Sequence, residues 1–355
     1  MKKVLILYND IQNYRVEAWN HIAGCFQLDV AFSGKDESTT PCVFNKILFT
    51  ARKIGPFFFV PRKLHNTFKN YDVIVFYADL HYASYCILPF LPRKYKTIPW
   101  TIGFGVSYSH PYRVDRKHTF YDWVYKKLLL KCDAILFYME KAKEFWANSS
   151  FDFNKVFIAT NTVRVKDIEL KVEKKKDFLF VGTLYAGKGL DKLIDSFAKV
   201  KQAIGLNNKL HIVGKGDQRD VLEQQVNGLG LQDDVIFHGA IYDEEILSQL
   251  FAKSVLCISP IQAGLTAPKS LGYGTPFVCR KDAITGGEMY HVTNGVNGIF
   301  YEKDEDLYEI MKDAVQNPKK YQVMCLAAKK YYDNNATPVH MAQGVIDAIN
   351  YALSH

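Results

Sequence analysis

The chain has 355 residues, a hydrophobic fraction of 48% and a formal net charge of +8. This length is too great for one ordinary core and predicts two domains, and the hydrophobic fraction excludes a disordered chain. The longest apolar runs, near residues 56–61 and 86–91, are much shorter than the roughly 20 residues that span a bilayer. The first apolar run also ends at Asn9 and Asp10, which predicts a first strand and not a signal peptide.

The seven cysteines include no C-x-x-C pair, and most, such as Cys132 and Cys257, lie in apolar segments. An odd number of cysteines in such surroundings favours free buried thiols and a cytoplasmic protein. No His/Cys spacing typical of a metal site is present, so we expect no metal. The acidic triplet at residues 304–306 resembles a metal-binding Asp-x-Asp, but its place before a late helix favours a role at the helix N-terminus.

The positive charge is concentrated in one region. Residues 40–131 hold 15 Lys and Arg against 4 Asp and Glu, a net charge of +11 from 15 minus 4. This excess either keeps a surface solvated or attracts an anionic partner, which would be a membrane or a nucleic acid. We do not expect nucleic acid, because no nucleic-acid-binding motif accompanies the charge.

Short apolar strands alternate with helical segments in the N-terminal half, which predicts a parallel sheet in an α/β domain. The expected strands are residues 3–8, 28–32, 71–77, 97–102, 134–138 and 156–159. The turn after the first strand reads NDIQNYR and lacks G-x-G-x-x-G, so we expect neither NAD nor FAD and no other cofactor. Parallel sheets bind ligands at the carboxyl ends of their strands, where we expect Asp10, Arg15, His81, Gly103, Gly105 and His110.

A second α/β unit begins after residues 161–176, a charged segment in which the strand pattern breaks. An expected strand at 178–181 leads into a glycine-rich turn, Gly182 to Gly189, and then into a helix at 190–204. Lys188 closes that turn. A further strand at 210–213 is followed by Gly214 and Gly216. A lysine at a glycine turn is suited to a phosphate, although a surface lysine is the alternative.

The stretch from Ser254 to Gly298 is the richest in ligand-binding features. An apolar strand at 255–258 turns through Gly264 and Leu265 into a helix, for which Thr266 is the expected N-cap. Free backbone N–H groups at such a helix start are suited to a phosphate. After a strand at 276–279, the turn Gly286-Gly287-Glu288 places a carboxylate where backbone can approach a ligand. The N–H groups of the first turn could donate hydrogen bonds to a diphosphate, and the carboxylate of the second could accept them from sugar hydroxyls. The two turns together therefore suit a sugar joined to a diphosphate.

This order of motifs resembles the donor-binding half of the nucleotide-sugar glycosyltransferases of GT-B architecture, in particular the retaining family four. The resemblance covers about residues 178–301. The matching positions are Lys188, Gly264, Gly274, Pro276, Gly286, Gly287, Glu288, Asn297 and Gly298. Three positions depart from the family. Ile261 and Lys269 replace its two spaced glutamates, and Thr183 stands where the family usually has a phosphate-binding arginine.

The resemblance implies two Rossmann-like domains that face each other across a cleft. We expect an acceptor domain at residues 1–163, a linker at 164–176, a donor domain at 177–335 and a C-terminal helix at 336–355 that returns to the first domain. The implied activity is the transfer of a sugar, with retention, from a nucleoside diphosphate to a saccharide or lipid-linked acceptor in polysaccharide biosynthesis. A nucleotide-sugar 2-epimerase and a non-catalytic GT-B subunit are the alternatives.

We assign candidate residues to the two sides of the cleft from their places at strand ends and glycine turns together with the resemblance, although a lone histidine can equally be structural. Candidate catalytic groups are His81, His110 and Glu288. The expected donor-binding residues are Gly182, Thr183, Lys188, Gly214, Gly264, Leu265, Thr266, Lys269, Gly286, Gly287 and Glu288.

The basic region predicts where the acceptor is met. Its bases alternate with bulky apolar residues, and Phe57–Val60 and Ile87–Leu91 could enter the headgroup boundary of a membrane. Core packing of these aromatic residues is the alternative. The bases expected to meet anionic lipid are Arg52, Lys53, Arg62, Lys63, Arg93 and Lys94. The hypothesis is a peripheral enzyme on the inner face of the membrane.

Overall fold

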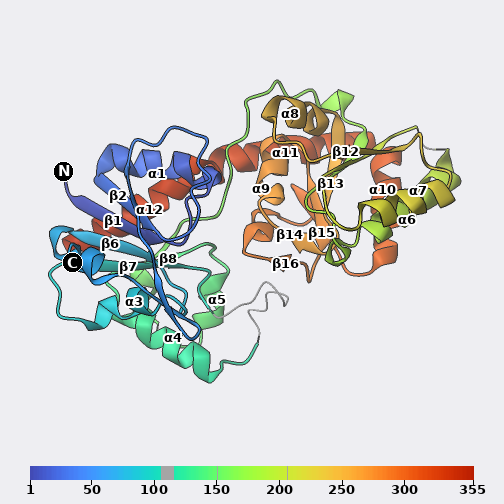
Figure 1. Cartoon of the computed structure of the whole chain (residues 1–355). Coiled ribbons are helices and arrows are strands. Elements are labelled where there is room, and N and C mark those ends of the chain that lie inside the picture. Colours follow the sequence, from blue (N-terminus) through green and yellow to red (C-terminus); the bar gives the residue numbers. More distant parts are fainter. Residues whose placement is uncertain (105–115, 150, 206) are drawn as a thin grey trace. The chain divides into compact units, whose positions relative to one another are not determined.

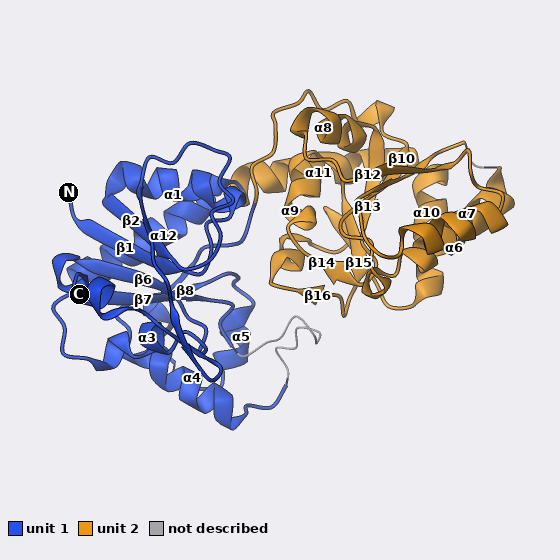
Figure 2. Cartoon of the chain, viewed as in Figure 1, with its two compact units in different colours: residues 1–106, 113–162, 337–355 blue, residues 107–112, 163–336 orange. Residues whose placement is uncertain are grey.

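The structure is a computed structural model that describes residues 1–104, 116–149, 151–205 and 207–355 (Figure 1). Gly105 and His110, both predicted on the acceptor side, lie outside these residues. The chain forms two compact units (Figure 2). Unit 1 holds the described residues up to Thr162 together with Thr337–His355, and unit 2 holds Val163–Ala336.

Unit 1 is built on a seven-stranded sheet of order β3-β2-β1-β6-β7-β8-β9, in which every recorded pairing is parallel. The chain runs outward from β1 to β3, then returns to the other side of β1 and runs outward again. Because crossovers between parallel strands are right-handed, the helices of these two halves cover opposite faces. The helix α12 packs on α1 and on β6 to β9, which leaves the other face to α2, α3 and α4.

The strands of unit 1 are β1 (Lys3–Tyr8), β2 (Gln27–Phe32), β3 (Asn45–Leu48), β4 (Arg52–Ile54), β5 (Phe57–Phe59), β6 (Val73–Tyr77), β7 (Lys96–Thr101), β8 (Ile135–Phe137) and β9 (Val156–Ile158). Its helices are α1 (Asn13–Cys25), α2 (Arg62–His65), α3 (Ala83–Cys86), α4 (Phe120–Lys131), α5 (Ala142–Trp146) and α12 (Pro338–Ser354), with short 3-10 turns η1 (Phe68–Asn70), η2 (Leu88–Phe90) and η3 (Phe153–Lys155). The antiparallel hairpin β4–β5, which the sequence pattern did not predict, stands outside the main sheet.

Unit 2 repeats the doubly wound plan with a six-stranded sheet of order β12-β11-β10-β13-β15-β17, again with parallel pairings. Its main strands are β10 (Asp177–Val181), β11 (Leu210–Val213), β12 (Val235–Gly239), β13 (Ser254–Ile258), β15 (Phe277–Arg280) and β17 (Gly298–Tyr301), and β14 (Gln262–Ala263) pairs with β16 (Ile284–Thr285). The helices are α6 (Leu190–Ile204), α7 (Arg219–Gly228), α8 (Glu244–Lys253), α9 (Thr266–Gly272), α10 (Asp304–Gln316) and α11 (Pro318–Asn335), with 3-10 turns η4 (Val172–Lys174), η5 (Ala186–Lys188) and η6 (Glu288–His291).

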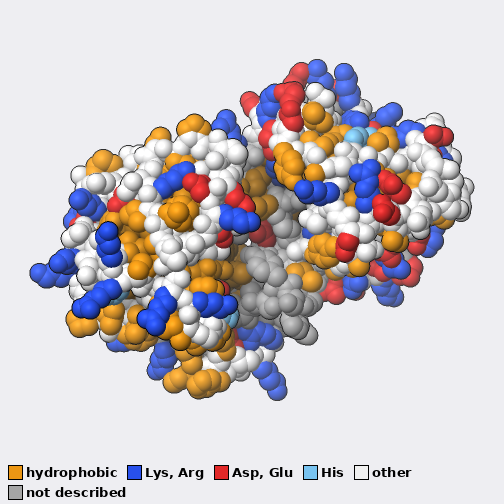
Figure 3. Space-filling view, viewed as in Figure 1, with side chains coloured by type: hydrophobic (Ala, Val, Ile, Leu, Met, Phe, Trp, Pro, Cys, Tyr) orange, Lys and Arg blue, Asp and Glu red, His pale blue; other side chains and the backbone are white. Residues whose placement is uncertain are grey.

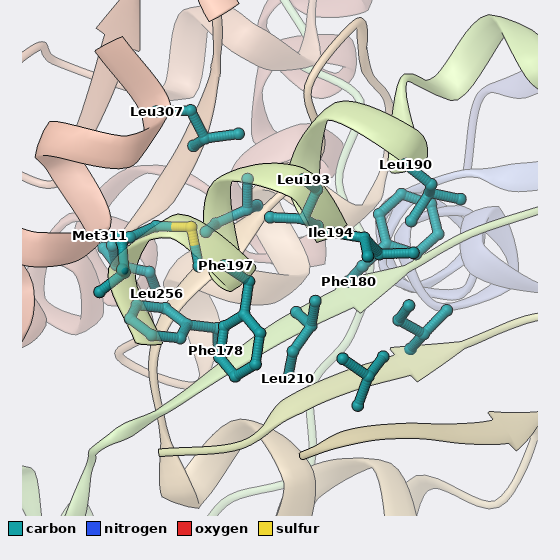
Figure 4. Close-up of a cluster of buried hydrophobic side chains, with 14 of the residues drawn as sticks. Phe178, Phe180, Leu190, Leu193, Ile194, Phe197, Leu210, Leu256, Leu307 and Met311 are labelled. Atoms are coloured by element: carbon teal, nitrogen blue, oxygen red, sulfur yellow. The ribbon is translucent and has the colours of Figure 1, made fainter. Parts of the chain in front are cut away.

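The core of unit 2 lies on both faces of this sheet because successive residues of a strand point to opposite sides. Phe178 and Phe180 of β10 pack with α6 and α10 in one cluster (Figure 4). Leu179, between them, packs in a second cluster with residues of α8, α9 and α11. Strands that are buried on both sides read as continuous apolar runs, which is why the sequence predicts them.

The segment predicted as a linker, residues 164–176, is packed within unit 2. Val165 and Ile168 contact the second core cluster. Lys175 is buried, and its Nζ donates hydrogen bonds to the Phe251 carbonyl at 2.6 Å and to Thr275 Oγ1 at 2.9 Å. Lys175 lies at the C-terminal end of α8, where the last carbonyl groups have no hydrogen-bond donor within the helix. Its ammonium supplies that donor. Most of this segment is therefore not a free tether.

The close packing of α12 on unit 1 can be tested at Gly344. A Cβ on this residue would lie 1.9 Å from the carbonyl oxygen of Ile158. We predict that Gly344→Ala lowers the free energy of unfolding by about 1–3 kcal/mol, since backbone cannot yield without a shift of the helix. Urea unfolding measures the change. Gly24→Ala in α1, where nothing lies within 4 Å, is the control and should stabilise by roughly 0.5–1 kcal/mol; equal effects would contradict the packing described.

Candidate functional site

The turn after β10 is held against the turn after β11 by close backbone contacts. The Gly182 N–H donates to the Val213 carbonyl at 2.9 Å. Gly214 has φ +151°, and a Cβ there would lie 1.8 Å from the Gly182 carbonyl oxygen, while one on Gly216 would lie 2.0 Å from that of Leu184. Only glycine fits at Gly214 and Gly216, so these predicted ligand-site glycines have a steric role in forming the turn.

Lys188 ends that turn with a cation for which the described residues provide no recorded counter-charge. Its Nζ lies 5.5 Å from the centre of the Tyr185 ring and 3.8 Å from the place a Cβ on Gly182 would take. Among the residues the structure describes, no hydrogen bond or ion pair is recorded for this ammonium. Burial lowers the pKa of Lys188 to about 8. A partly desolvated ammonium without an acidic partner is suited to an anionic ligand.

The loop after β13 lies beside the Lys188 turn. Gly189 has φ +69°, and a Cβ there would lie 2.8 Å from Ile261 Cδ1. The Tyr185 hydroxyl donates to Gln262 Oε1 at 2.6 Å, and the Thr266 hydroxyl donates to the Val181 carbonyl at 3.1 Å. These bonds join the two turns without using a charged group.

The predicted N-cap at Thr266 is wrong, because this residue is the first of α9 and Leu265 precedes the helix. The Thr266 side chain bonds Val181 instead of a helix N–H. The Ala267 N–H already donates to the Gly264 carbonyl at 2.9 Å, and Pro268 has no N–H to offer. The start of this seven-residue helix therefore supplies fewer anion donors than the sequence pattern predicts.

Glu288 is brought to the same loop by the small sheet β14–β16. That sheet pairs Gln262 with Ile284, and the Ile284 N–H donates to the Ile261 carbonyl at 2.8 Å. The Glu288 carboxylate is buried, and its Oε2 accepts hydrogen bonds from the Gly286 N–H at 2.9 Å and from the Thr285 hydroxyl at 3.3 Å. Gly287 has φ +119°, which allows this close turn. The turns at 182–189, 259–266 and 286–288 thus meet at the carboxyl ends of adjacent strands.

Lys269 does not present a free charge. Its Nζ forms an ion pair with Glu244 of α8, and the other oxygen of that carboxylate accepts from the Tyr273 hydroxyl at 2.7 Å. The reversed charge at this position is therefore matched inside unit 2. Ile261, the other departure from the family pattern, packs on Gly189. Both substitutions have a structural account that needs no ligand.

In unit 1, Asp10 and Gly103 have local structural contacts. Asp10 Oδ1 accepts from the Lys35 N–H at 2.7 Å. Gly103 has φ +109°, and its carbonyl accepts from Trp146 Nε1 at 2.8 Å. The His81 side chain is 62% exposed and its Nδ1 lies 2.7 Å from Asp79 Oδ1.

Arg15 is buried at the carboxyl end of β1. Its guanidinium lies 4.7–5.5 Å from the ring centres of Tyr8, Tyr14, Trp100 and Tyr138, and Nη2 donates to Asn161 Oδ1 at 2.9 Å. Cation–π contacts and hydrogen bonds replace the carboxylate that a buried arginine would otherwise need. Arg15 Nη1 is also buried, and no hydrogen-bond partner is recorded for it among the described residues.

Sequence reasoning missed Tyr185, Gln262 and Thr285, which hold the three turns together. Thr285 Oγ1 accepts from the N–H groups of Gly287 at 3.0 Å and Met289 at 3.2 Å. Their signal in the sequence is only their position within glycine-rich turns.

The acidic triplet behaves as a helix start. The residues form the first turn of α10, and Asp306 Oδ2 accepts from the Lys303 N–H at 2.9 Å. Within the described ranges, no cluster of three His, Cys, Asp or Glu side chains could hold a metal ion. All seven cysteines are free thiols.

Part of the chain matches a known protein family. Residues 163–331 match the family model described as glycosyl transferases group 1. An uncharacterised glycosyltransferase of Methanocaldococcus jannaschii is 33% identical over 137 residues, which are 38% of this chain and 34% of that protein. The O-antigen chain mannosyltransferase of Salmonella typhimurium is 29% identical over 188 residues, or 48% of this chain and 52% of that protein. The matches thus span about a third and about a half of these relatives.

Among solved structures, HepE of Anabaena in complex with UDP is similar over 99% of this chain and 100% of its own, with a TM-score of 0.70 and 16% identity. The same protein has been solved with UDP-glucose. Two Rossmann-like units with parallel sheets define the GT-B fold, and the chain has that fold. Residues 163–331 thus match the group 1 glycosyltransferase model, and the chain as a whole has the GT-B fold.

The pairing of Lys269 generates a prediction for the charge reversal. Lys269→Glu restores the family's carboxylate but sets it against Glu244. We expect the free energy of unfolding to fall by about 1–2 kcal/mol, between the values for exposed and buried pairs. Adding Glu244→Lys should recover most of this loss, which urea unfolding of the single and double variants measures.

The restored carboxylate should also give no gain in sugar transfer, because Ile261 still replaces its family partner. Higher turnover in Lys269→Glu, or equal stability of the single and double variants, would contradict this account.

Proposed function

We propose that the chain transfers a sugar from a nucleoside-diphosphate donor to a saccharide acceptor, with Lys188 bound to the diphosphate. The observation that carries the proposal is the ammonium of Lys188, which is half-buried at a glycine turn and has no recorded acidic partner among the described residues. The leaving diphosphate gains negative charge as the sugar departs, and a fixed cation stabilises that charge. The similarity of the fold to a protein solved with UDP and UDP-glucose supports a uridine nucleotide as the first donor to test.

The buried Glu288 turn supplies the second part of the proposed donor site. Its Oε2 already accepts two hydrogen bonds from the turn, so the carboxylate is fixed in place before a ligand arrives. A preorganised acceptor can bind sugar hydroxyls without reordering its own side chain. Gly182, Thr183, Gly214, Gly264, Leu265, Thr266, Gly286 and Gly287 complete the proposed donor site as backbone around it, whereas Lys269 contributes only through Glu244.

The acceptor side of the proposal rests on unit 1, with Asp10, Arg15, His81 and Gly103 as candidates. The resemblance to family four implies retention at the anomeric carbon. A saccharide acceptor in polysaccharide synthesis is also consistent with a relative named as an O-antigen chain mannosyltransferase.

A non-catalytic GT-B subunit is the alternative that Ile261 and Lys269 favour, since neither offers the carboxylate that the family has.

The donor proposal predicts a loss of nucleotide affinity in Lys188→Ala. We expect UDP or GDP, whichever the wild-type protein binds, to bind about 1.5–3 kcal/mol more weakly, the usual cost of losing a hydrogen bond from a charged group. Calorimetry measures the change, and Lys192→Ala is the control, because Lys192 lies four residues further along and is exposed on α6.

The same site should respond to pH. The Lys188 ammonium binds the anion only when protonated, and its pKa is about 8. Wild-type affinity should therefore fall by up to about tenfold from pH 7 to pH 9, whereas Lys188→Arg should keep its affinity over this range. Unchanged affinity in Lys188→Ala with the fold intact would remove this lysine from the site.

A surface of unit 1 supports a lipid-linked acceptor and peripheral membrane association. Seven large apolar side chains are exposed in β4–β5, in α3–η2 and at the start of α4. We name this set the docking strip: Ile54, Phe57, Ile87, Phe90, Phe120, Tyr121 and Trp123. Phe120 is 78% exposed and Trp123 56% exposed. Exposed aromatic residues at this density are typical of interaction surfaces.

The elements of the docking strip are joined to one another. The Phe58 N–H donates to the His81 carbonyl at 2.7 Å and the Phe58 ring stacks on Tyr82, which ties the hairpin to the segment before α3. The η2 turn contacts both α3 and α4. In Figure 3, the visible surface around α4 carries hydrophobic side chains next to Lys and Arg, with few acidic side chains near them.

Five of the six predicted lipid-facing bases are exposed, and the sixth is not. Arg93 pairs with Asp133 at 3.0 Å and has a side chain only 15% exposed, so it holds β7 and the end of α4 instead. Arg52, Lys53, Arg62, Lys63 and Lys94 are exposed. Each base near an anionic membrane contributes on the order of 1 kcal/mol, which suffices for reversible docking. Within the described part of the chain, no helix is long and apolar enough to cross a membrane.

The docking proposal predicts binding to vesicles that contain anionic lipid. Sedimentation should be strong with phosphatidylglycerol, weak with phosphatidylcholine alone, and reduced by salt. The triple variant Arg62→Glu, Lys63→Glu and Lys94→Glu should lose at least tenfold in affinity.

The control makes the same charge change in unit 2 with Lys192→Glu, Lys199→Glu and Lys319→Glu, all exposed. If this control loses as much binding as the first triple variant, or if the wild-type protein stays in the supernatant at low salt, the docking proposal fails and a soluble acceptor replaces it.

A further inference from the structure

A cavity of about 490 Å³ lies in unit 1 at the base of the β4–β5 hairpin. One wall is the stem that leads into the hairpin, Ile47 to Phe49, and another is the stem that leaves it, Pro61 to Leu64. The remaining lining residues are Lys3, Gln27, Asp29, Thr67, Asn70 and Tyr71. A volume of this size is within the range of small-molecule sites, which is about 300–1,000 Å³.

This cavity is separate from the proposed donor site. All of its lining residues belong to unit 1, from Lys3 and Gln27 at the starts of β1 and β2 to Leu48 and Phe49 at the end of β3. The donor turns belong to unit 2. The cavity is therefore an additional site.

The lining combines an apolar wall with a cationic rim. Ile47, Leu48 and Leu64 contribute hydrocarbon, and Leu48 is 69% exposed. Lys63 is exposed, and no ion pair is recorded for it among the residues that the structure describes. The one carboxylate in the lining, Asp29, accepts from the Tyr71 hydroxyl at 2.6 Å. Burial, together with this hydrogen bond, raises the pKa of Tyr71.

These features select an amphiphile with a negative head. An apolar wall favours a hydrocarbon chain over a sugar, and the basic rim disfavours a cationic headgroup. The place of the cavity favours a ligand that comes from a membrane. Both of its walls continue directly into the hairpin that carries Ile54 and Phe57 of the docking strip.

We propose that the cavity binds one acyl chain of an anionic phospholipid, with the phosphate held at the rim by Lys63 and Lys3. This inference rests on the proposed membrane docking and adds a stoichiometric lipid site to it. Membrane docking would then have two parts. The docking strip and the exposed bases would contact the membrane surface without selecting one lipid molecule, and the cavity would bind a single lipid. The second part distinguishes phospholipids by headgroup charge even in the absence of a bilayer.

The test uses dihexanoyl phosphatidylglycerol as a monomer, below its micelle concentration, with the full chain in a calorimeter. We expect saturable binding of one lipid per chain and at least tenfold weaker binding of dihexanoyl phosphatidylcholine. Leu48→Asp, which places a charge on the exposed apolar wall, and Lys63→Glu should each weaken binding at least tenfold. The double variant Phe120→Ser and Trp123→Ser should bind the monomeric lipid normally but lose affinity for vesicles.

Further ligands test the parts of this inference one at a time. Glycerol 3-phosphate that binds as tightly as the lipid would overturn the acyl-chain part, and equal binding of both lipids would overturn the headgroup part. Absence of monomer binding would overturn the whole inference. Nucleotide affinity measured on the same variants should stay unchanged, so that a failure of the proposed donor site is recognised independently.

Discussion

The structure of the donor-side unit depends on the close approach of two turns, which only glycine allows. A side chain on Gly214 would collide with the carbonyl of Gly182, at 1.8 Å. This contact holds the turn after β10 over the end of β11, and that turn carries Lys188. The bonds from Tyr185 to Gln262 and from Thr266 to Val181 then attach the loop after β13. The cation of Lys188 thus lies on a turn held by close backbone packing and by side-chain hydrogen bonds. An anionic ligand can supply the charge that the described residues do not.

Much of this arrangement could be predicted from the sequence because it depends on local patterns. Parallel strands buried on both faces read as apolar runs, and the bounds predicted for α6, residues 190–204, are those of the structure, since Gly189 and Gly205 flank it with positive φ. Two α/β units and a GT-B fold follow from such patterns and their order. The position of Lys188 at a glycine turn is equally visible in the sequence.

The parts that could not be predicted depend on contacts between distant residues. Lys269 meets Glu244 and Arg93 meets Asp133, and no local pattern shows that a charge is already matched by a partner 25 or 40 positions away. Thr266 bonds a carbonyl on β10 in place of its own helix. The exposure of Phe120 and Trp123 is likewise a tertiary property, because an aromatic residue in a helix is usually part of the core. The donor site therefore has less free positive charge than the sequence predicts. The proposed membrane-facing surface also includes α4, which the sequence did not predict.

The proposed donor site has the Lys188 ammonium for the diphosphate, the buried Glu288 carboxylate for the sugar and backbone groups around them. Catalysis requires that this reduced site still releases the nucleoside diphosphate. The most direct measurement is the release of UDP or GDP from a panel of nucleotide sugars, with vesicles that contain lipid extract as the source of acceptor. We expect one nucleotide sugar to release its nucleoside diphosphate at a rate proportional to the enzyme concentration. Lys188→Ala should abolish most of this release. Tight nucleotide binding without release from any donor in the panel would contradict it and favour a non-catalytic GT-B subunit.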